Sequence, residues 1–334
     1  MKGVNLGGWL VLERWIAPSV FHGYASKDEY SLCLEASLVE ATARLNKHRS
    51  TFITEKHIEQ IAKLGLNTVR VPVGYWLFGG VEPFVKGGDK YVEQLFFWAD
   101  KWDIAVILDF HAAPGSQNGW DHSGKAGELG WYTDPTNIQA SISFLEELCQ
   151  RFGHQKALVG VEVLNEPHWD VPIDQLLAYY QRAYEVIRAN CHLDVSVIFS
   201  DAFRPYEMAK ALSRLEMRNI MIDVHLYQLF TDEDRALDLD GHLDKVADHW
   251  ANELNDISSH VPVLVGEWSA AMSEDFQMNG QQSHRNYSLA DYQQYFSAQT
   301  ELFKRANVSW AYWTARTEDQ GVWSFLDHPK FIQK

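Results

Sequence analysis

Cysteine and long apolar runs are scarce in this chain of 334 residues. The three cysteines, Cys33, Cys149 and Cys191, have neither the CxxC spacing of a metal or redox motif nor the even number of a disulfide framework. No apolar run approaches about 18 residues, so we expect no membrane-spanning segment. The first residues also lack the charged and apolar regions of a signal peptide. We therefore expect a cytoplasmic protein, or a secreted one if a leader has been removed.

Basic residues are also in short supply. The chain has 29 Lys and Arg against 45 Asp and Glu, which gives a formal net charge of -16. Nucleic acids and anionic membranes bind basic patches, so we expect neither as a partner. A neutral substrate suits this charge, and we expect a monomer. Aromatic residues are abundant by contrast, with 13 Trp, and their flat rings can stack on the apolar faces of sugars.

Several catalytic and cofactor motifs are missing as well. The chain has no HExxH zinc motif and no GxSxG nucleophile elbow, and the Gly7-Gly8 pair lacks the spacing of a dinucleotide-binding turn. His111, His225 and two glutamates could in principle bind Zn²⁺, but they include no local ligand pair. We therefore expect neither a metal nor a cofactor.

Strands and helices are expected to alternate along the chain. Short β-branched runs predict strands at residues 3–9, 67–73, 104–110, 158–164, 195–200, 220–227, 261–267 and 308–314. Amphipathic segments predict helices at 54–64, 89–102, 135–153, 174–190, 206–215, 240–258 and 289–306. About eight such units favour a closed (β/α)8 TIM barrel, with residues 1–334 as a single catalytic domain. An open, doubly wound sheet is the alternative. Residues 10–50 are expected to form a long irregular segment.

Two of the predicted strands end in a glutamate. The apolar run LVGVEVL at residues 158–164 leads into Asn165, Glu166 and Pro167, and the run VPVLVG at 261–266 leads into Glu267 and Trp268. Either glutamate could simply cap its strand or pair with an arginine. Two carboxylates at the carboxyl ends of buried strands are, however, the minimum equipment for glycosidic bond cleavage.

Further polar residues lie at or near the predicted strand ends, where barrel enzymes place their chemistry. A single strand-end histidine is often structural, and a buried arginine often serves an ion pair. One or two residues from each of six strands are hard to explain as packing. The set comprises Arg70, His111, Asn165, Glu166, His225, Tyr227, Glu267 and Trp313.

All of these residues except Trp313 lie in motifs that extend from the first predicted strand to the seventh. The motifs are GVNLGGWLVLE at residues 3–13, NTVRVPV at 67–73, DFHAAPGSQNG at 109–119, LNEP at 164–167, HLY at 225–227 and GEW at 266–268. On these motifs the chain resembles glycoside hydrolase family 5, in its exo-β-1,3-glucanase branch. The opening motif and the motif at 109–119 are the more specific ones, since many barrel glycosidases share LNEP. Arg14 and Trp15, which follow the opening motif, differ from the usual sequence of this branch.

The resemblance implies a retaining hydrolase without a cofactor. Glu166 would be the acid/base and Glu267 the nucleophile, with Arg70 keeping Glu267 ionised and Tyr227 holding it. Asn165 would bond the sugar 2-hydroxyl, and Trp313 would floor the first sugar subsite. His111 and His225 would line the pocket, and Glu13 would bind hydroxyls of the terminal sugar.

We accordingly expect an exo-acting enzyme that removes glucose from the non-reducing end of β-1,3-linked, and also β-1,6-linked, glucans or gluco-oligosaccharides. An enzyme of other linkage or endo mode, such as a β-1,4-glucanase, is the alternative, and a non-catalytic carbohydrate-binding barrel is a third reading. Two further residues, Trp120 and Phe230, lie in loops after different strands. We expect their rings to flank the entrance and grip the leaving sugar.

Overall fold

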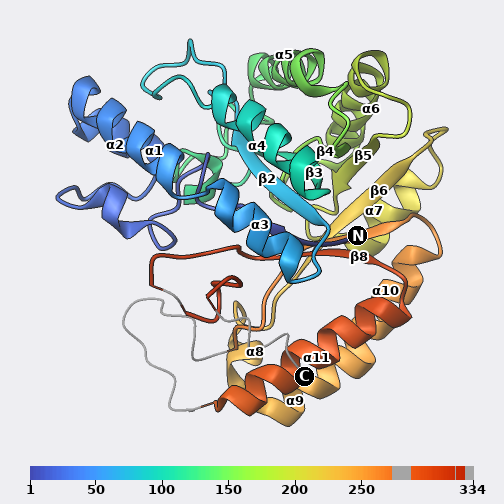
Figure 1. Cartoon of the computed structure of the whole chain (residues 1–334). Helices are drawn as coiled ribbons and strands as arrows, with labels where there is room; N and C mark the ends of the chain where they lie inside the picture. The colour runs from blue at the N-terminus through green and yellow to red at the C-terminus, as the bar shows by residue number, and fades with distance from the viewer. Residues whose placement is uncertain (273–286, 320, 328–334) are drawn as a thin grey trace.

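The strands close into a ring. The computed structural model describes residues 1–272, 287–319 and 321–327, and its eight parallel strands form a closed barrel in the order of the sequence (Figure 1). The last strand pairs with the first, Gly3 opposite Ala311. This confirms the predicted (β/α)8 barrel, and the open-sheet alternative is wrong. The strands are β1 (Lys2–Asn5), β2 (Thr68–Gly74), β3 (Ala105–Ala112), β4 (Leu158–Glu162), β5 (Ser196–Ser200), β6 (Ile220–Leu226), β7 (Val263–Trp268) and β8 (Ser309–Tyr312).

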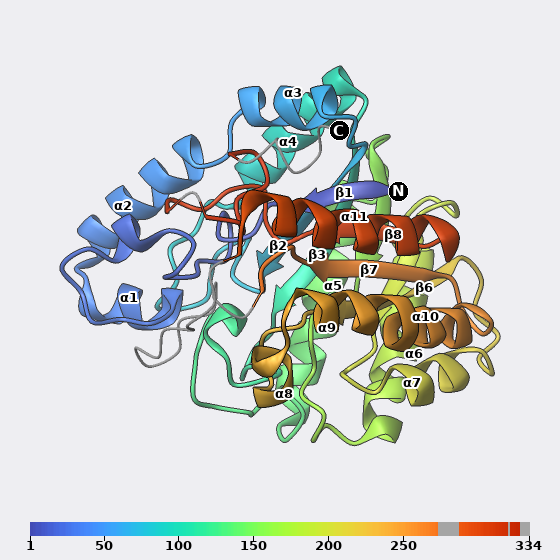
Figure 2. The same ribbon diagram turned by 90° about the horizontal axis from the view of Figure 1, so that it is seen from below.

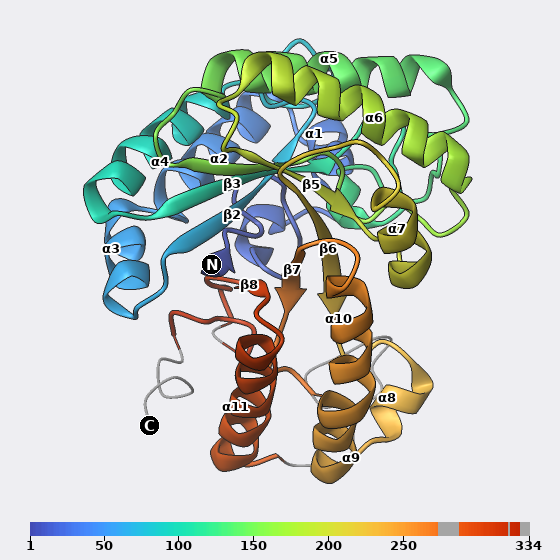
Figure 3. The ribbon, with the colours of Figure 1, turned by 90° about the vertical axis from the view of Figure 1, so that its right-hand side faces the viewer.

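Helices cover the outside of the barrel. α5 and α6 pack against each other, as do α3 and α4 (Figure 3). A cap fixes where α5 begins: the Asp134 side chain accepts a hydrogen bond from Thr136 N, with Pro135 in the first turn of the helix. The predicted helices are present as α3 (Glu55–Lys63), α4 (Asp89–Trp102), α5 (Pro135–Phe152), α6 (Ile173–Asn190), α7 (Pro205–Leu212) and α11 (Leu289–Arg305). Among the described helices, none combines the length and apolar character needed to cross a bilayer.

The segment predicted to be irregular at residues 10–50 contains two helices, so that prediction is wrong. They are α1 (Glu29–Glu35) and α2 (Leu38–Thr51), and side-chain caps from Asp28 and Ser37 begin them. Both helices lie on the side of the barrel toward which β1 points (Figure 2). They are tied to the loop after β1, because Trp9 Nε1 donates to the Arg49 carbonyl and Leu12 N donates to Glu29 Oε2.

The connection between β6 and β7 contains one helix more than predicted. α9 (Leu239–Asp244), a π-helical stretch (Lys245–Trp250) and α10 (Ala251–Ser258) follow one another without a gap and together cover the helix predicted at 240–258. Asp238 caps this run by accepting a hydrogen bond from Gly241 N. Before it, the cap at Thr231 begins the short helix α8 (Asp232–Ala236), which was not predicted.

The inside of the barrel is unusually polar near the carboxyl ends of the strands. Fully buried polar or charged side chains come from five strands, each flanked by apolar residues that face outward. They are Asn5, Arg70, Asp109, Glu162 and Asp223. Gly266 makes room for this layer, since a Cβ there would lie 1.9 Å from Asp223 Oδ2. Gly266 N also donates to Asp223 Oδ1 at 2.6 Å, which fixes the backbone just before Glu267.

Candidate active site

Arg70 is the centre of the polar layer. It is fully buried, and its guanidinium lies 3.1 Å from Asp109, 2.7 Å from Glu162 and 3.1 Å from Glu267. Nη2 donates to Asn165 Oδ1 at 2.7 Å, and Nη1 donates to Asn5 Oδ1 at 3.0 Å. Burial would lower the pKa of Arg70, but the surrounding carboxylates raise it well above its usual value. One permanent cation thus orients acidic and amide groups from several strands.

The orientation of the Glu267 carboxylate depends on Arg70 and on Tyr227. Arg70 Nη1 donates to Oε1, and the Tyr227 hydroxyl donates to Oε2 at 3.0 Å. Burial and the neighbouring Glu267 raise the pKa of Tyr227 well above its usual value, so the phenol stays protonated and keeps donating. Both oxygens of Glu267 are therefore held in place, as a carboxylate that must attack along a defined line requires.

Glu166 lies four residues beyond the end of β4, with a positive φ of 44°. Its Oε1 lies 2.6 Å from His225 Nδ1, and its Oε2 lies 3.3 Å from His122 Nε2. Burial would raise the pKa of Glu166, but His225 and then His122 hold it below its usual range. Burial would lower the pKa of His225, but Glu267, Asp223 and Glu166 raise it well above its usual value. The opposite pKa shifts favour a single proton in the Glu166–His225 pair, held on the imidazole rather than on the carboxylate.

The two glutamates approach each other closely. One carboxylate oxygen of Glu166, one of Glu267 and a ring nitrogen of His225 all lie within 4.8 Å of one another. Retaining glycosidases place their carboxyl groups about 5–5.5 Å apart, whereas inverting ones need about 6.5–9.5 Å to admit a water. This close approach favours the retaining arrangement over the inverting one.

Trp313 and Glu13 lie close to the glutamates. The indole of Trp313 stacks on His111 with the centroids 5.6 Å apart and the planes at 9°. Gly7 allows this, because a Cβ there would lie 2.8 Å from the Trp313 ring. Glu13 is buried and accepts a hydrogen bond from Trp15 Nε1 at 2.8 Å. Burial and then the negative charges of Asp121, Glu267 and Glu166 raise the pKa of Glu13 well above its usual range.

The two predicted entrance rings have different neighbours. Trp120 contacts His122, Trp169 and Phe203, with ring centroids 5.5, 6.2 and 5.6 Å away. Phe230 is half exposed and packs at 5.2 Å against Tyr227, which binds Glu267. Each ring is thus linked to one of the glutamates. Their joint grip on a leaving sugar stays a prediction.

Sequence reasoning missed several residues of this site. Asn5, Asp109, Glu162 and Asp223 lie before the ends of the predicted strands. A charged or amide side chain inside an apolar strand is nevertheless a signal, because such residues are rarely buried without a partner. His122 had no comparable signal. It lies in the loop after β3, and only the fold brings it to Glu166.

Among the residues that the structure describes, two groups of side chains have a spacing that could hold a metal ion: Glu162, Asp223 and His225, and Glu166, His225 and Glu267. Both groups already contact cationic or proton-donating partners. Arg70 Nε lies 2.7 Å from Glu162, and His225 Nδ1 lies 2.6 Å from Glu166. A metal would have to displace these contacts, and the buried guanidinium already supplies positive charge. The expectation of a metal-free site stays a prediction.

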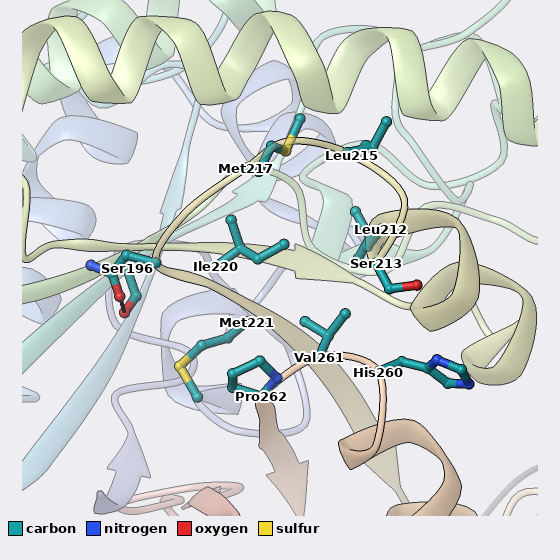
Figure 4. Close-up of a pocket in the computed structure, with 11 residues that line it drawn as sticks. Ser196, Leu212, Ser213, Leu215, Met217, Ile220, Met221, His260, Val261 and Pro262 are labelled. Carbon is teal, nitrogen blue, oxygen red and sulfur yellow. Dashed lines mark hydrogen bonds between the residues drawn. The ribbon is translucent and has the colours of Figure 1, made fainter.

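A pocket of about 390 Å³ lies at the opposite end of the barrel (Figure 4). Its lining includes Ser196 and Ile220, the first residues of β5 and β6, and Pro262, which directly precedes β7. Because chemistry in (β/α)8 enzymes collects at the carboxyl ends of the strands, this pocket is not the candidate active site.

Comparisons with known proteins agree with this geometry. The family model "Cellulase (glycosyl hydrolase family 5)" matches residues 37–319. The chain is 34% identical to "Probable glucan 1,3-beta-glucosidase A" of Emericella nidulans, in an alignment that covers 98% of this chain and 88% of that protein. It is 32% identical to "Glucan 1,3-beta-glucosidase" of Pichia angusta, covering 96% of this chain and 82% of that protein.

Solved structures show the same fold at lower identity. A rutinosidase from Aspergillus niger superposes with a TM-score of 0.83 at 20% identity, covering 99% of this chain and 97% of that one. A hyperthermophilic endo-beta-1,4-glucanase superposes with a TM-score of 0.59 at 15% identity, covering 94% and 88%. Enzymes of different specificity thus share this barrel.

Proposed function

The chain belongs to glycosyl hydrolase family 5 and is a glycoside hydrolase; from that premise we propose that it is a retaining, exo-acting β-glucosidase. Its substrates are β-1,3-linked glucans or gluco-oligosaccharides, from which it removes glucose at the non-reducing end, with tolerance of β-1,6 bonds. The observation that carries the proposal is the approach of Glu166 and Glu267 oxygens within 4.8 Å. The names of relatives such as that of Emericella nidulans support the substrate class.

In the proposed first step, Glu267 attacks the anomeric carbon. Arg70 and Tyr227 hold its two oxygens, so the reacting oxygen is aimed before the substrate arrives. Glu166 donates a proton to the glycosidic oxygen and the leaving group departs. The proton comes from the Glu166–His225 pair along the 2.6 Å contact between them. A covalent glycosyl-enzyme on Glu267 results.

In the proposed second step, a water takes the place of the leaving group. Glu166 is now the base: it accepts a proton from that water as the water attacks the anomeric carbon, the bond between that carbon and Glu267 breaks, and Glu267 leaves as a carboxylate. Asn165 is held by Arg70 and binds the sugar 2-hydroxyl. Trp313 forms the floor of the first sugar subsite, and His111 and His225 line its sides. Glu13 binds hydroxyls of the terminal sugar, and its raised pKa makes it a proton donor as well as an acceptor.

Exo action is supported by the segment after β1. α1 and α2 lie over the side of the barrel to which the strand leads, and Trp15 of that segment contacts Trp323 at 5.3 Å. Such a wall beside the terminal-sugar subsite would block one end of the cleft. An endo-acting β-1,4-glucanase on the same scaffold would need that end open. A non-catalytic binding barrel is disfavoured because both glutamates are present and positioned.

We also propose that residues 1–334 act as one monomeric catalytic domain without nucleic-acid or membrane partners, in keeping with the net charge of -16. The substrate is tested by product analysis on laminarin, gentiobiose and cellobiose side by side. We expect glucose as the early product from laminarin, slower release from gentiobiose and little from cellobiose. Early release of mixed oligosaccharides from laminarin, or a preference for cellobiose, would contradict the proposal.

A further inference from the structure

His225 joins the proposed acid/base to a carboxylate buried beneath the cleft. Its Nδ1 lies 2.6 Å from Glu166 Oε1, and its Nε2 lies 3.5 Å from Asp223 Oδ2. Asp223 and His225 both come from β6. The side chain of Asp223 is fully buried, and that of His225 is 5% exposed. The imidazole therefore lies between the proposed acid/base and an acid that is sealed off from the substrate.

The position of Asp223 is fixed by the backbone of the neighbouring strand. Oδ1 accepts a hydrogen bond from Gly266 N at 2.6 Å, and Oδ2 occupies space that a Cβ at Gly266 would fill. Oδ2 is thereby directed at two cationic groups, His225 Nε2 at 3.5 Å and Arg70 Nε at 3.6 Å. Among the described residues, neither Oδ2 nor His225 Nε2 has another hydrogen-bond partner. At 3.5 Å the contact is longer than an ordinary hydrogen bond, so it acts through charge, and a proton on His225 is stabilised by it.

A second acid, Glu162, lies beside this pair. One of its carboxyl oxygens, one of Asp223 and a ring nitrogen of His225 lie within 4.8 Å of one another. Glu162 Oε2 accepts from Arg70 Nε at 2.7 Å, whereas Oε1 is buried without a hydrogen-bond partner among the described residues. An ionised carboxylate with such an oxygen is strongly destabilised, but a protonated carboxyl group has an O–H to donate.

The charges around Arg70 identify Glu162 as the protonated acid. Asp109, Glu162, Asp223 and Glu267 all lie between 2.7 and 3.6 Å from this one guanidinium. Burial, and then the negative charges of Asp109 and Asp223, raise the pKa of Glu162 well above its usual range against the opposing effect of Arg70. Asp223, by contrast, has a backbone N–H donor and two cationic neighbours, which favour its charged form.

We propose that Asp223 is a positioning residue for the acid/base: with a protonated Glu162 beside it, its carboxylate holds His225 as an imidazolium whose Nδ1 proton faces Glu166. This inference rests on the proposed β-glucosidase function, and it adds two buried acids to the groups that hold the catalytic proton.

The proton moves in a closed cycle. In the first step Glu166 takes it from His225 Nδ1 and passes it to the leaving oxygen, so that a neutral imidazole remains with its Nε2–H toward Asp223. In the second step Glu166 accepts a proton from the attacking water, and His225 takes that proton at Nδ1. The net change is the addition of water across the glycosidic bond. Asp223 neither gains nor loses a proton, but its charge favours the return of the proton to the imidazole.

Other charged groups also face this pair. Those facing His225 are Glu166 after β4, Asp201 after β5 and Glu267 in β7. His122 and His111 face Glu166 from β3 and the loop that follows it. All of these groups are kept in the variants used below, so a difference between variants reports on the buried acids.

The test measures the protonation of His225 directly and through catalysis. NMR of enzyme labelled with nitrogen-15 histidine, assigned with His225→Asn, follows the imidazole across the pH range, and the pH profile of kcat/KM is recorded on a β-glucoside. Asp223→Asn keeps an oxygen for Gly266 N but removes the charge. The NMR titration of His225 and the alkaline limb of kcat/KM should both move to lower pH by roughly one to three pH units, the usual effect of one adjacent opposite charge.

Glu162→Gln separates the roles of the two buried acids. Glutamine is as neutral as a protonated carboxyl group and still offers an oxygen to Arg70 Nε, so the titration and the alkaline limb should stay where they are in the native enzyme. The infrared band of a protonated carboxyl group, seen in the native enzyme at neutral pH, should be lost in this variant. The matched control is Asp89→Asn, which removes a carboxylate paired with Arg151 between α4 and α5. It should change neither the titration nor the band.

Several results would overturn the inference. A His225 titration that is the same in Asp223→Asn and in the native enzyme would remove the role of Asp223. An alkaline limb that moves as far in Glu162→Gln as in Asp223→Asn would show that Glu162 is ionised. Loss of the His225 proton near the usual pH of about 6.5 in the native enzyme would overturn the inference even if Asp223→Asn does not fold. NMR and infrared spectra need no substrate, so an enzyme that gives the expected spectra but hydrolyses no β-glucoside would overturn the proposed function alone.

Discussion

Single side chains fix the geometry of the candidate site, and Arg70 orients more of its groups than any other residue described above. It donates to Glu267, Asn165 and Glu162 at once. A lysine could not replace it, because one ammonium cannot reach carboxylates on three sides in a fixed planar arrangement. The two glutamates then differ through their neighbours. Glu267 is held by a guanidinium and a phenol, whereas Glu166 is flanked by two histidines.

The roles of the two glutamates can be separated by substitution. Glu267→Ala removes the proposed nucleophile and should abolish turnover of every glucoside. Glu166→Ala removes the proton donor, and general acid help is worth roughly 10²–10⁴-fold. Laminarin should lose that factor, while the first step on an aryl glucoside with a very good leaving group should be largely spared. The measurement is burst-phase kinetics on the aryl glucoside beside steady-state rates on laminarin. An equal loss in both would contradict the assignment of Glu166.

The proton shared by Glu166 and His225 predicts an alkaline limit to activity. The pKa of His225 is raised well above its usual 6.5, with Glu267 as the largest favourable cause after the opposing effect of burial. The pair therefore keeps its proton below that raised pKa and loses it, together with acid catalysis, as the pH rises through it. In His225→Asn the proton can rest only on Glu166, so the alkaline limb of kcat/KM should move to lower pH. The groups facing His225 that also set this limb are Asp223, Glu166, Glu267 and Asp201.

The pH profile of kcat/KM, measured for the native enzyme and for His225→Asn, checks this prediction. His57→Asn is a suitable control, since His57 lies in α3 on the outside of the barrel and forms a cap at Thr54. Its profile should match that of the native enzyme. An alkaline limb that stays in place in His225→Asn would show that the proton is not held by this pair.

At the scale of elements, the packing of α1 against α2 is stabilised by one buried ion pair, between Glu29 and Arg49. Glu29 Oε1 accepts from Arg49 Nη2 at 3.1 Å and from Trp76 Nε1 at 3.0 Å, and both charged side chains are nearly inaccessible. Glu29→Ala leaves the guanidinium buried without its carboxylate, which typically costs about 3–5 kcal/mol. The free energy of unfolding, measured by urea titration, should fall by about that amount. Glu59→Ala breaks the exposed pair with Lys63 and should change it little.

These same helices mark where prediction from sequence failed. The β-strands were found because each is a short apolar run, and the strand ends then gave the positions of Glu166 and Glu267. α2 buries only four side chains, and two of them are His48 and Arg49. Its apolar stripe is therefore too sparse to be recognised, and the helix is stabilised by its contacts with Glu29 and the loop after β1. The contact of His122 with Glu166 could not be foreseen either, because it depends on how a loop folds over the barrel.

At the scale of the whole molecule, the closed barrel predicts the stereochemistry of the reaction. Because Glu166 follows β4 and Glu267 is the next-to-last residue of β7, on different sides of a rigid ring, their oxygens are kept within 4.8 Å by the fold itself. We expect net retention, so that β-glucose is the first product. Proton NMR of fresh hydrolysate, recorded before mutarotation, detects the anomer directly. Initial release of α-glucose would show an inverting reaction and would contradict the proposed mechanism.

The hydrogen-bonded centre at Arg70 also makes the two halves of the chain unequal. The first half contributes the guanidinium of Arg70, together with Asn5, Asp109 and Glu162, whereas the second half contributes the acids Asp223 and Glu267 and the imidazole of His225. Cut between β4 and β5, the second fragment would have to bury its acids without the guanidinium, while the first would hold that guanidinium short of partners. The contacts of this centre are therefore complete only when both halves are joined.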